Sequence, residues 1–279
     1  MMRSLYSGVS GLRNHQTRMD VIANNISNVN TIGFKSSRVV FQDVMSQTSR
    51  SAGAQGTQYG GTNPMQIGLG VKTAAIDVLH TQSAFQRTDN PLDLAIEGDG
   101  FFVVAENVAS GTPNYKYTRA GNLYLDNTGH LVTSEGLYVQ GWTGTNPPTP
   151  PQTSPGAKID LKDYNGISID TNGVIWGLNP SNVKTQIATI AIATFVNPPG
   201  LEKQGSSLYD ETPNSGAAVY NVARTGAAGA VSAGGLEMSN VDLSAEFTDM
   251  IITQRGFQAN SRIITTSDTL LEELINLKR

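Results

Sequence analysis

The two ends of this 279-residue chain carry the periodicity of amphipathic helices, and the long segment between them does not. Near the N-terminus, apolar residues recur every three or four positions, which is the spacing of one helical face: Leu5, Val9, Leu12, Met19, Ile22 and Ile26. The same spacing is stronger near the C-terminus, in Leu243, Phe247, Met250, Phe257, Ile263, Leu270, Leu274 and Leu277. We therefore expect one helix at each end of the chain.

Residues that favour helix ends support both expectations. Ser4 is a candidate N-cap of the first helix. Asp242 and Glu246 lie at the start of the second helix and Lys278 and Arg279 at its end, which is the order that the helix dipole favours. Gly256 interrupts this second helix and costs about 1 kcal/mol relative to alanine. Its presence indicates close packing or a bend at that point, and the alternative is an exposed glycine that the helix tolerates.

Two helices at opposite ends of one chain lack a third and fourth helix to cover them. A pair alone would leave apolar side chains in water, and most protein helices need tertiary packing to persist. We therefore expect these helices to pack against helices of other copies, as in a coiled-coil-like assembly. The alternative is that both helices lie on the domain between them. The first helix is separated from that domain by a polar segment, 46–70, that has almost no apolar anchors. This separation favours packing against other copies over packing on the domain.

The middle of the chain shows strand patterns. Apolar residues alternate in "PLDLAIE", and "TQIATIAIATFV" is a long run rich in β-branched residues. The segments "YLDNTGHLV" and "SIDTNGVIW" each place a turn sequence between two short strands, as in a β-hairpin. The Pro-rich stretch 145–155 is typical of a loop or spacer.

These patterns predict an α+β fold whose terminal helices form a coiled-coil-like core domain. The predicted sections are the core domain (1–30 with 241–279), an extended or disordered arm or linker (31–70), and a mainly antiparallel β-rich domain (71–240).

Composition argues against several classes of partner. The net charge is −4, the sequence has no basic run, and nucleic acid and anionic membranes are therefore not expected partners. No stretch approaches the 18 or more apolar residues of a membrane helix, and no cleavable signal segment is visible at the N-terminus.

The chain has no cysteine, which suits a protein that travels unfolded. Either it stays in the cytoplasm, or it is exported without a cleaved signal peptide.

No pattern of catalytic or metal-binding residues emerges. His15, His80 and His130 are scattered without ligand spacing, and we expect solvated surface histidines. The loop from Asp126 to His130 lacks the closing glutamate of a calcium loop. The stretch "GLGVKT" lacks the third glycine of a dinucleotide motif and the context of a phosphate-binding loop. The sequence predicts no catalytic residue, no metal and no cofactor.

The end of the first helix has an unusual sequence, "IANNISNVNTIGFK" from residue 22 to residue 35. Four asparagines crowd it, although asparagine favours helix ends and turns over helix interiors: Asn24, Asn25, Asn28 and Asn30. Three further blocks follow in order, "LDLAIEGDGFFVV" (92–104), "YTRAGNLYLDNTGHLV" (117–132) and "EMSNVDLSAEFTDMIITQRGFQANSRIITTSDTLLEELINL" (237–277). With these four blocks, the chain resembles the bacterial flagellar axial proteins, the family of rod, hook and hook-associated proteins.

The resemblance implies roles for the residues singled out above. In this family the terminal helices form the inner coiled-coil core of a hollow tube, an extended arm follows, and a β domain lies outside. The apolar residues of the two helices would then be subunit-interface residues. The asparagines would end the core helix by binding its last carbonyls and the turn backbone. Gly33 would permit a positive φ, and Phe34 would anchor the arm against a neighbour.

Within the family, the C-terminal residues around Asp242, Leu243 and Gln258 resemble the hook protein, in its short form, more than the distal rod protein. The prediction is a structural, non-enzymatic subunit of the flagellar hook, a bendable tube that joins rod to filament and transmits torque. Its expected partners are other copies of itself, the distal rod and hook–filament junction proteins, the hook cap and the flagellar export apparatus. The expected location is extracellular, in the hook and basal body. Two alternatives remain, namely the distal rod protein and a secreted β-rich binding module.

Overall fold

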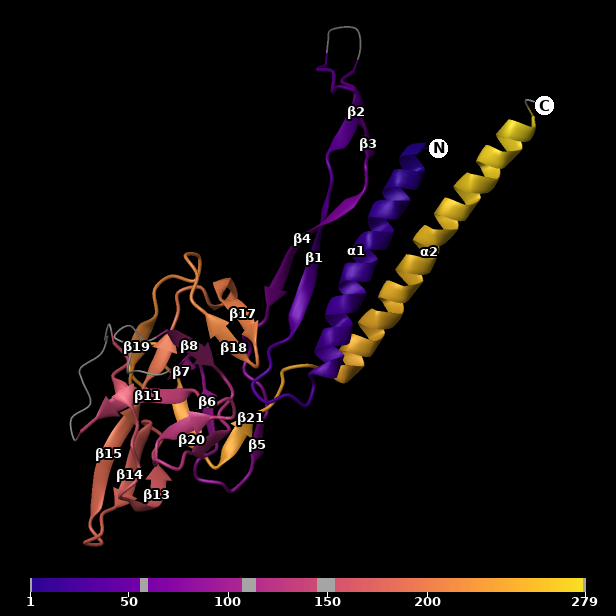
Figure 1. Cartoon of the computed structure of the whole chain (residues 1–279). Coiled ribbons are helices and arrows are strands. Elements are labelled where there is room, and N and C mark those ends of the chain that lie inside the picture. Colours follow the sequence, from indigo (N-terminus) through magenta and orange to yellow (C-terminus); the bar gives the residue numbers. More distant parts are fainter. Residues whose placement is uncertain (1, 56–59, 107–113, 145–153, 278–279) are drawn as a thin grey trace. The chain divides into compact units, whose positions relative to one another are not determined.

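The computed structural model describes the chain except residues 1, 56–59, 107–113, 145–153 and 278–279 (Figure 1). Its contacts divide the chain into two compact units. The helix–ribbon unit comprises Met1–Ser27, Ser37–Leu79 and Val241–Arg279. The β unit comprises Asn28–Ser36 and His80–Asn240.

The helix–ribbon unit contains both predicted helices. α1 spans Met2–Ser27 and α2 spans Leu243–Asn276, and the two run antiparallel and side by side (Figure 1). The carboxylate of Asp242 caps α2 by accepting from the backbone N–H of Ser244 at 2.8 Å. The Ser4 cap predicted for α1 is wrong, because the helix already begins at Met2. Neither described helix has an apolar stretch of the length and hydropathy needed to cross a membrane.

A two-stranded ribbon completes this unit. β1 (Ser37–Asp43) pairs antiparallel with β4 (Val71–Val78), and β2 (Ser46–Arg50) pairs antiparallel with β3 (Met65–Gly68). The segment expected to be an extended or disordered arm therefore contains paired strands. Polar side chains do not prevent pairing, because the ladder hydrogen bonds are made by the backbone.

The grouping of segments also differs from the ranges expected from the sequence. The expected arm ended at residue 70, whereas Ser37–Leu79 groups with the two helices. Conversely, Asn28–Ser36 groups with the β unit.

The β unit is built round a 13-stranded sheet with antiparallel pairing, joined by two two-stranded sheets, β6–β20 and β5–β21. Its strands are β5 (Phe85–Arg87), β6 (Leu94–Glu97), β7 (Phe101–Ala105), β8 (Tyr115–Thr118), β9 (Leu123–Leu125), β10 (Leu131–Thr133), β11 (Tyr138–Thr143), β12 (Ala157–Lys158), β13 (Asn165–Ile169), β14 (Val174–Leu178), β15 (Lys184–Ile190), β16 (Ile192–Thr194), β17 (Glu202–Gly205), β18 (Leu208–Asp210), β19 (Val219–Asn221), β20 (Ala230–Ala233) and β21 (Gly235–Glu237). A short 3-10 helix, η2 (Pro198–Gly200), precedes β17. Two helices with mainly antiparallel strands confirm the α+β class.

Both predicted hairpins are present. β9 pairs with β10 round the turn that begins at Asp126, and β13 pairs with β14 round the turn that begins at Asp170. In each turn a glycine with positive φ, Gly129 or Gly173, donates its N–H to the carbonyl of the aspartate. The Pro-rich stretch falls mostly on 145–153, outside the described residues.

The apolar core of the chain lies in the β unit. Its buried side chains form two clusters, and strands β7, β15 and β16 contribute to both the sheet and these clusters. The first cluster includes Leu94, Phe102, Val104, Ile175 and Ile190. The second includes Phe101, Tyr117, Tyr209 and Tyr220. Apolar burial in the described chain is therefore concentrated in this unit.

Candidate assembly interface

The contact between α1 and α2 is made by small and polar residues. A Cβ atom added at Gly256 would lie 2.7 Å from the ring of His15, and one added at Gly11 would lie 2.7 Å from the amide of Asn260. The two α2 residues that are fully buried are Thr253 and Ser267. The helices therefore approach closely where side chains are small, and the tight packing expected at Gly256 is present.

Polar bonds fix this pairing. Arg18 and Asp249 form an ion pair at 2.9 Å, and the side chain of Asn25 donates to Glu246 at 3.0 Å. On the other side of α1, the amide of Asn14 donates to the backbone carbonyl of Val71 in β4 at 2.6 Å. Such bonds specify one register between elements, whereas apolar contacts alone tolerate sliding.

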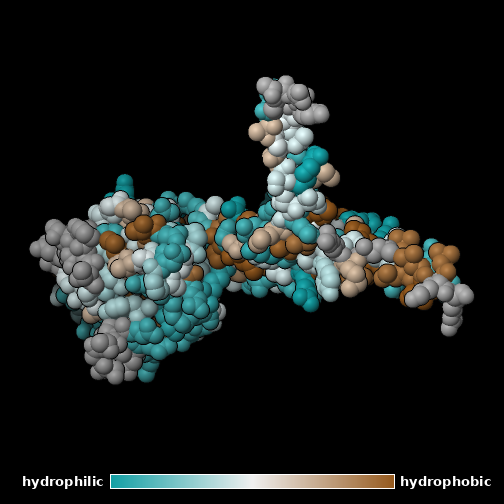
Figure 2. All heavy atoms as spheres, turned by 90° about the horizontal axis from the view of Figure 1, so that it is seen from above, coloured by the Kyte–Doolittle hydropathy of each residue, from teal (hydrophilic) through white to brown (hydrophobic). Residues whose placement is uncertain are grey.

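The apolar residues predicted as interface differ in burial, and half of them are exposed. Ile22 is buried, at 4% exposed. Leu5, Val9, Leu12, Met19, Ile26 and Met250 are half-buried. The remaining α2 positions are exposed, from 37% at Phe257 to 83% at Leu277, and include Leu243, Phe247, Ile263, Leu270 and Leu274. Hydrophobic side chains are visible at the C-terminal end of α2, on the right of Figure 2.

The ribbon also exposes apolar side chains on one face. Gln47 is paired with Ile67, and partners in an antiparallel ladder share a face. Residues two positions apart along a strand point to the same face. The face that carries Ile67 therefore also carries Met45, Met65 and Leu69, and all four side chains are exposed. Their neighbours on the other face, Thr48 and Gln66, are polar. A two-stranded ribbon is only marginally stable in water unless its apolar face is covered.

At the end of α1, Asn25 is 2% exposed and has partners that differ from those expected. Its amide donates to the carbonyl of Ser37 at 2.8 Å, and its side-chain oxygen accepts from the N–H of Ser37 at 3.0 Å. Asn25 therefore joins the helix to the first residue of β1, and does not bind the last helical carbonyls. Asn24 and Asn30 are exposed. The carbonyl of Asn28 accepts from the N–H of Thr31 at 3.1 Å.

Gly33 has the positive φ expected of it, +66°. A Cβ atom there would lie 2.7 Å from the backbone nitrogen of Ala120, so the position excludes a side chain for two separate reasons. Its N–H donates to the carbonyl of Glu237 at 2.9 Å. The ammonium nitrogen of Lys203 lies 4.9 Å from the centre of the Phe34 ring. Phe34 therefore has a partner within its own chain.

A buried ion cluster next to this turn was not predicted. Lys35 is fully buried and contacts Glu237 at 2.6 Å, while Arg119 contacts the same carboxylate at 3.2 Å. Burial lowers the pKa of Lys35 although the neighbouring Glu237 opposes this shift. Breaking a buried pair by removing one partner costs about 3–5 kcal/mol. The only sequence signal was that these three residues fall in three of the blocks that carry the family resemblance.

Two histidines are also less exposed than expected. His15 packs against Phe41 and Gly256, and burial and Arg18 lower its pKa. Burial lowers the pKa of His80 to about 4, with a further contribution from nearby cations. The expectation of solvated surface histidines is therefore wrong for His15 and His80. Within the described part of the chain, no group of His, Asp and Glu residues could hold a metal ion.

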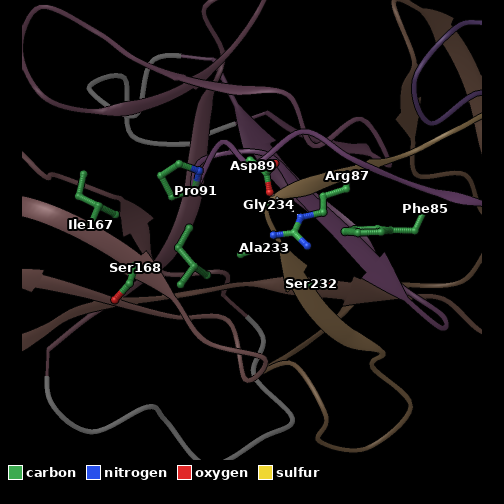
Figure 3. A pocket seen from close by; sticks show the side chains of 10 residues that line it. Phe85, Arg87, Asp89, Pro91, Ile167, Ser168, Ser232, Ala233 and Gly234 are labelled. Atoms are coloured by element: carbon green, nitrogen blue, oxygen red, sulfur yellow. Dashed lines mark hydrogen bonds and ion pairs between the residues drawn. The ribbon is translucent and has the colours of Figure 1, made fainter.

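The β unit contains several cavities and grooves. Figure 3 shows one of them, a groove beside β5, β13 and β20. Its two charged residues, Arg87 and Asp89, form an ion pair with one another, and Phe85, Pro91 and Ile167 supply apolar walls. Both side chains of this pair are exposed.

Comparison with known proteins agrees with the geometry. Residues 5–35 match the family described as "Flagella basal body rod protein", 95–177 match "Flagellar hook protein FlgE/F/G D1 domain", and 232–277 match "Flagellar basal body rod FlgEFG protein C-terminal".

Relatives match the chain over its full length. The chain is 50% identical to the flagellar basal-body rod protein FlgG of Bacillus subtilis, with all of both chains covered. It is 38% identical to FlgG and 34% identical to the flagellar hook protein FlgE of Borreliella burgdorferi, again over all of both chains. These are structural proteins of the flagellum. The chain therefore belongs to the family of bacterial flagellar rod and hook axial proteins.

Proposed function

We propose that this protein is a subunit of the distal flagellar rod, which polymerises into a hollow tube through the exposed faces of its terminal helices and its ribbon. In that tube the helices form the coiled-coil core, as expected from the sequence. The tube transmits torque as a stiff shaft, and the subunits reach it by export without a cleaved signal peptide.

One observation carries the assembly proposal. Among the residues of the helix–ribbon unit whose burial is described, Ile22 is the one apolar side chain that is fully buried. Burial of apolar surface contributes about 25 cal/mol per Å², so a unit with so little of it cannot offset its own ordering. Contacts from other copies would supply the missing apolar burial. The exposed apolar residues of α2 and of the ribbon are suited to make them.

Two observations favour rod over hook. The alignment with the rod protein of Bacillus subtilis covers 280 positions, close to the length of this chain, whereas the alignment with the hook protein of Borreliella burgdorferi needs 448. The segment 46–70, which lies in the arm expected to be extended or disordered, contains the paired strands β2 and β3. A paired ribbon resists bending more than a free linker does, which suits a stiff shaft.

The rod assignment changes the expected partners. Other copies of this chain remain the main partner, and the export apparatus remains the route. The hook cap and the hook–filament junction proteins are partners of a hook subunit and drop out of the proposal. The hook subunit stays the second candidate, because the residues around Asp242 and Leu243 resemble it.

Deletion of the gene in the source bacterium tests the assignment. Isolated basal bodies should end inside the cell envelope, with no distal rod, hook or filament, and plasmid-borne protein should restore all three. Electron microscopy of the purified basal bodies distinguishes the candidates. A complete rod that crosses the envelope but carries no hook would assign the protein to the hook.

A further inference from the structure

The ribbon exposes two thioether side chains on its apolar face. Met45 is 83% exposed and Met65 is 55% exposed. Among the other described methionines, three are half-buried: Met19, Met238 and Met250. A reagent in solution therefore reaches Met45 and Met65 without any opening of the structure.

The register of the ribbon places these two residues at opposite ends of its apolar face. The flanking pairs set Met45 opposite Leu69: Ser46 with Gly68, and the N–H of Val44 with the carbonyl of Gly70 at 2.9 Å. Met65 precedes Leu69 by four residues, which is about 13 Å along extended backbone, and Ile67 lies between them. A second surface that covers Ile67 and Leu69 therefore meets a thioether at each end.

Oxidation changes the chemical character of such a face. The thioether sulfur attacks one oxygen of a hydroperoxide such as hydrogen peroxide. An S–O bond forms as the O–O bond breaks, and the proton of the attacked oxygen passes to the departing hydroxide to give water. The sulfur is oxidised by two electrons and the peroxide is reduced. The product, methionine sulfoxide, is polar where the thioether was apolar, and its burial without a hydrogen-bond partner is costly.

We propose that Met45 and Met65 are oxidation sites, and that their oxidation by a hydroperoxide weakens association of the ribbon face with a second copy of this chain. The effect on association rests on the proposed polymerisation, whereas the reactivity of the two sites does not. The segment 46–70 has one charged residue, Arg50, so the ribbon offers little to a highly charged partner. Another copy presents exposed apolar residues of its own, among them Phe247 and Ile251 of α2.

The free and assembled protein then differ in their sensitivity to peroxide. In the free subunit both thioethers are exposed, and oxidation leaves the sulfoxides in water, where they cost little. In the polymer the second copy covers the face and excludes the oxidant. A subunit is therefore vulnerable before it is incorporated and protected afterwards.

Reaction rates in the full-length monomer test the two sites directly. The protein is treated with dilute hydrogen peroxide, and peptide mass spectrometry follows the oxidation of each methionine. Met45 and Met65 should react several-fold faster than the half-buried Met19 and Met250. Rates no faster than those of Met19 and Met250 would overturn the proposal.

Sedimentation of peroxide-treated protein tests the effect on association. The concentration at which half of the wild-type protein is assembled should rise about tenfold or more, the factor expected when one buried methionine side chain is lost. The double variant Met45→Leu with Met65→Leu keeps an apolar face that forms no sulfoxide, and its association should not respond to peroxide. Met2→Leu, which removes an exposed methionine outside the ribbon, should remain as sensitive as the wild type.

Reduction separates this effect from general damage. Methionine sulfoxide reductases specific for the two sulfoxide epimers should restore association of the treated wild-type protein. Unchanged association with both ribbon methionines fully oxidised would overturn the proposal.

Purified basal bodies provide the assembled state independently of association in the test tube. Within them, Met45 and Met65 should react more slowly with peroxide than in the monomer. Equal rates in the two samples would mean that no second copy covers the face, and would overturn the proposal. Failure of untreated monomer to associate would count against polymerisation by this chain alone, and the rates in basal bodies would still decide whether the face is covered.

Discussion

At the scale of single residues, the backbone conformation at Gly33 and the close contacts round it both exclude a side chain. It has a positive φ, and the backbone of Arg119 and Ala120 lies within 3.0 Å of where a Cβ atom would be. Gly136 has a positive φ of +84° with open space round it, and is a matched control for strain alone. We expect Gly136→Ala to cost about 1 kcal/mol and Gly33→Ala clearly more, because the backbone must also move. Urea unfolding of the two variants compares the costs, and equal values would contradict the close contact.

His80 gives the β unit a pH dependence whose sign follows from its pKa. Burial and the cations near it lower the pKa in the folded protein to about 4, below the ordinary value of 6.5. The unfolded chain therefore binds a proton first as pH falls. Stability is fully present above about pH 6.5 and is lost between there and pH 4, by at most on the order of 3 kcal/mol.

The variant His80→Phe separates this effect from the titration of carboxylates. Its unfolding free energy should depend less on pH than that of the wild-type protein between pH 6.5 and pH 4. Denaturant unfolding at several pH values in this window measures the difference in slope. Parallel curves for the two proteins would show that His80 titrates normally in the fold.

At the scale of elements, the α1–α2 pair depends on Gly256 fitting against His15. Gly256→Ala raises the intrinsic propensity of α2 by about 1 kcal/mol, but its methyl group would lie 2.7 Å from the imidazole. We expect α2 as an isolated peptide to become more helical, while pairing with α1 and tube assembly weaken. The double variant His15→Ala with Gly256→Ala should recover assembly, because it makes room for the methyl group. Circular dichroism of the peptide and sedimentation of the protein measure the two effects, and no recovery would place the defect elsewhere.

The sequence could predict the elements but not which of their faces meet. Periodicity located both helices to within a few residues, and the Asp-x-x-Gly turns located both hairpins, because these signals are local. The face between α1 and α2 includes small residues such as Gly11 and Gly256, which a search for apolar periodicity passes over. The pairing of β2 with β3 was missed because apolar residues are sparse between 46 and 70, and backbone pairing leaves no mark in composition. The cluster of Lys35, Arg119 and Glu237 depends on contacts between residues up to 202 positions apart.

At the scale of the whole molecule, the two units should differ in stability, because apolar burial is concentrated in the β unit. Limited proteolysis of the monomer should therefore cut α1, α2 and the ribbon first and leave His80–Asn240 protected. The cut should lie near Leu79, the end of the ribbon's segment in the helix–ribbon unit, and not at residue 70, where the expected arm ended.

The segment Asn28–Ser36 should survive with the β unit even after the ribbon is cut. Gly33 donates to the carbonyl of Glu237 at 2.9 Å, and Lys35 is buried against the carboxylate of the same residue. Native mass spectrometry should show this short piece bound to the protected fragment, and denaturing conditions should release it. In Lys35→Met the piece should be lost, because breaking a buried ion pair costs about 3–5 kcal/mol. Protection of both terminal helices in a verified monomer would instead mean that the helix–ribbon unit is stable without other copies, and would remove the main support for its role in assembly.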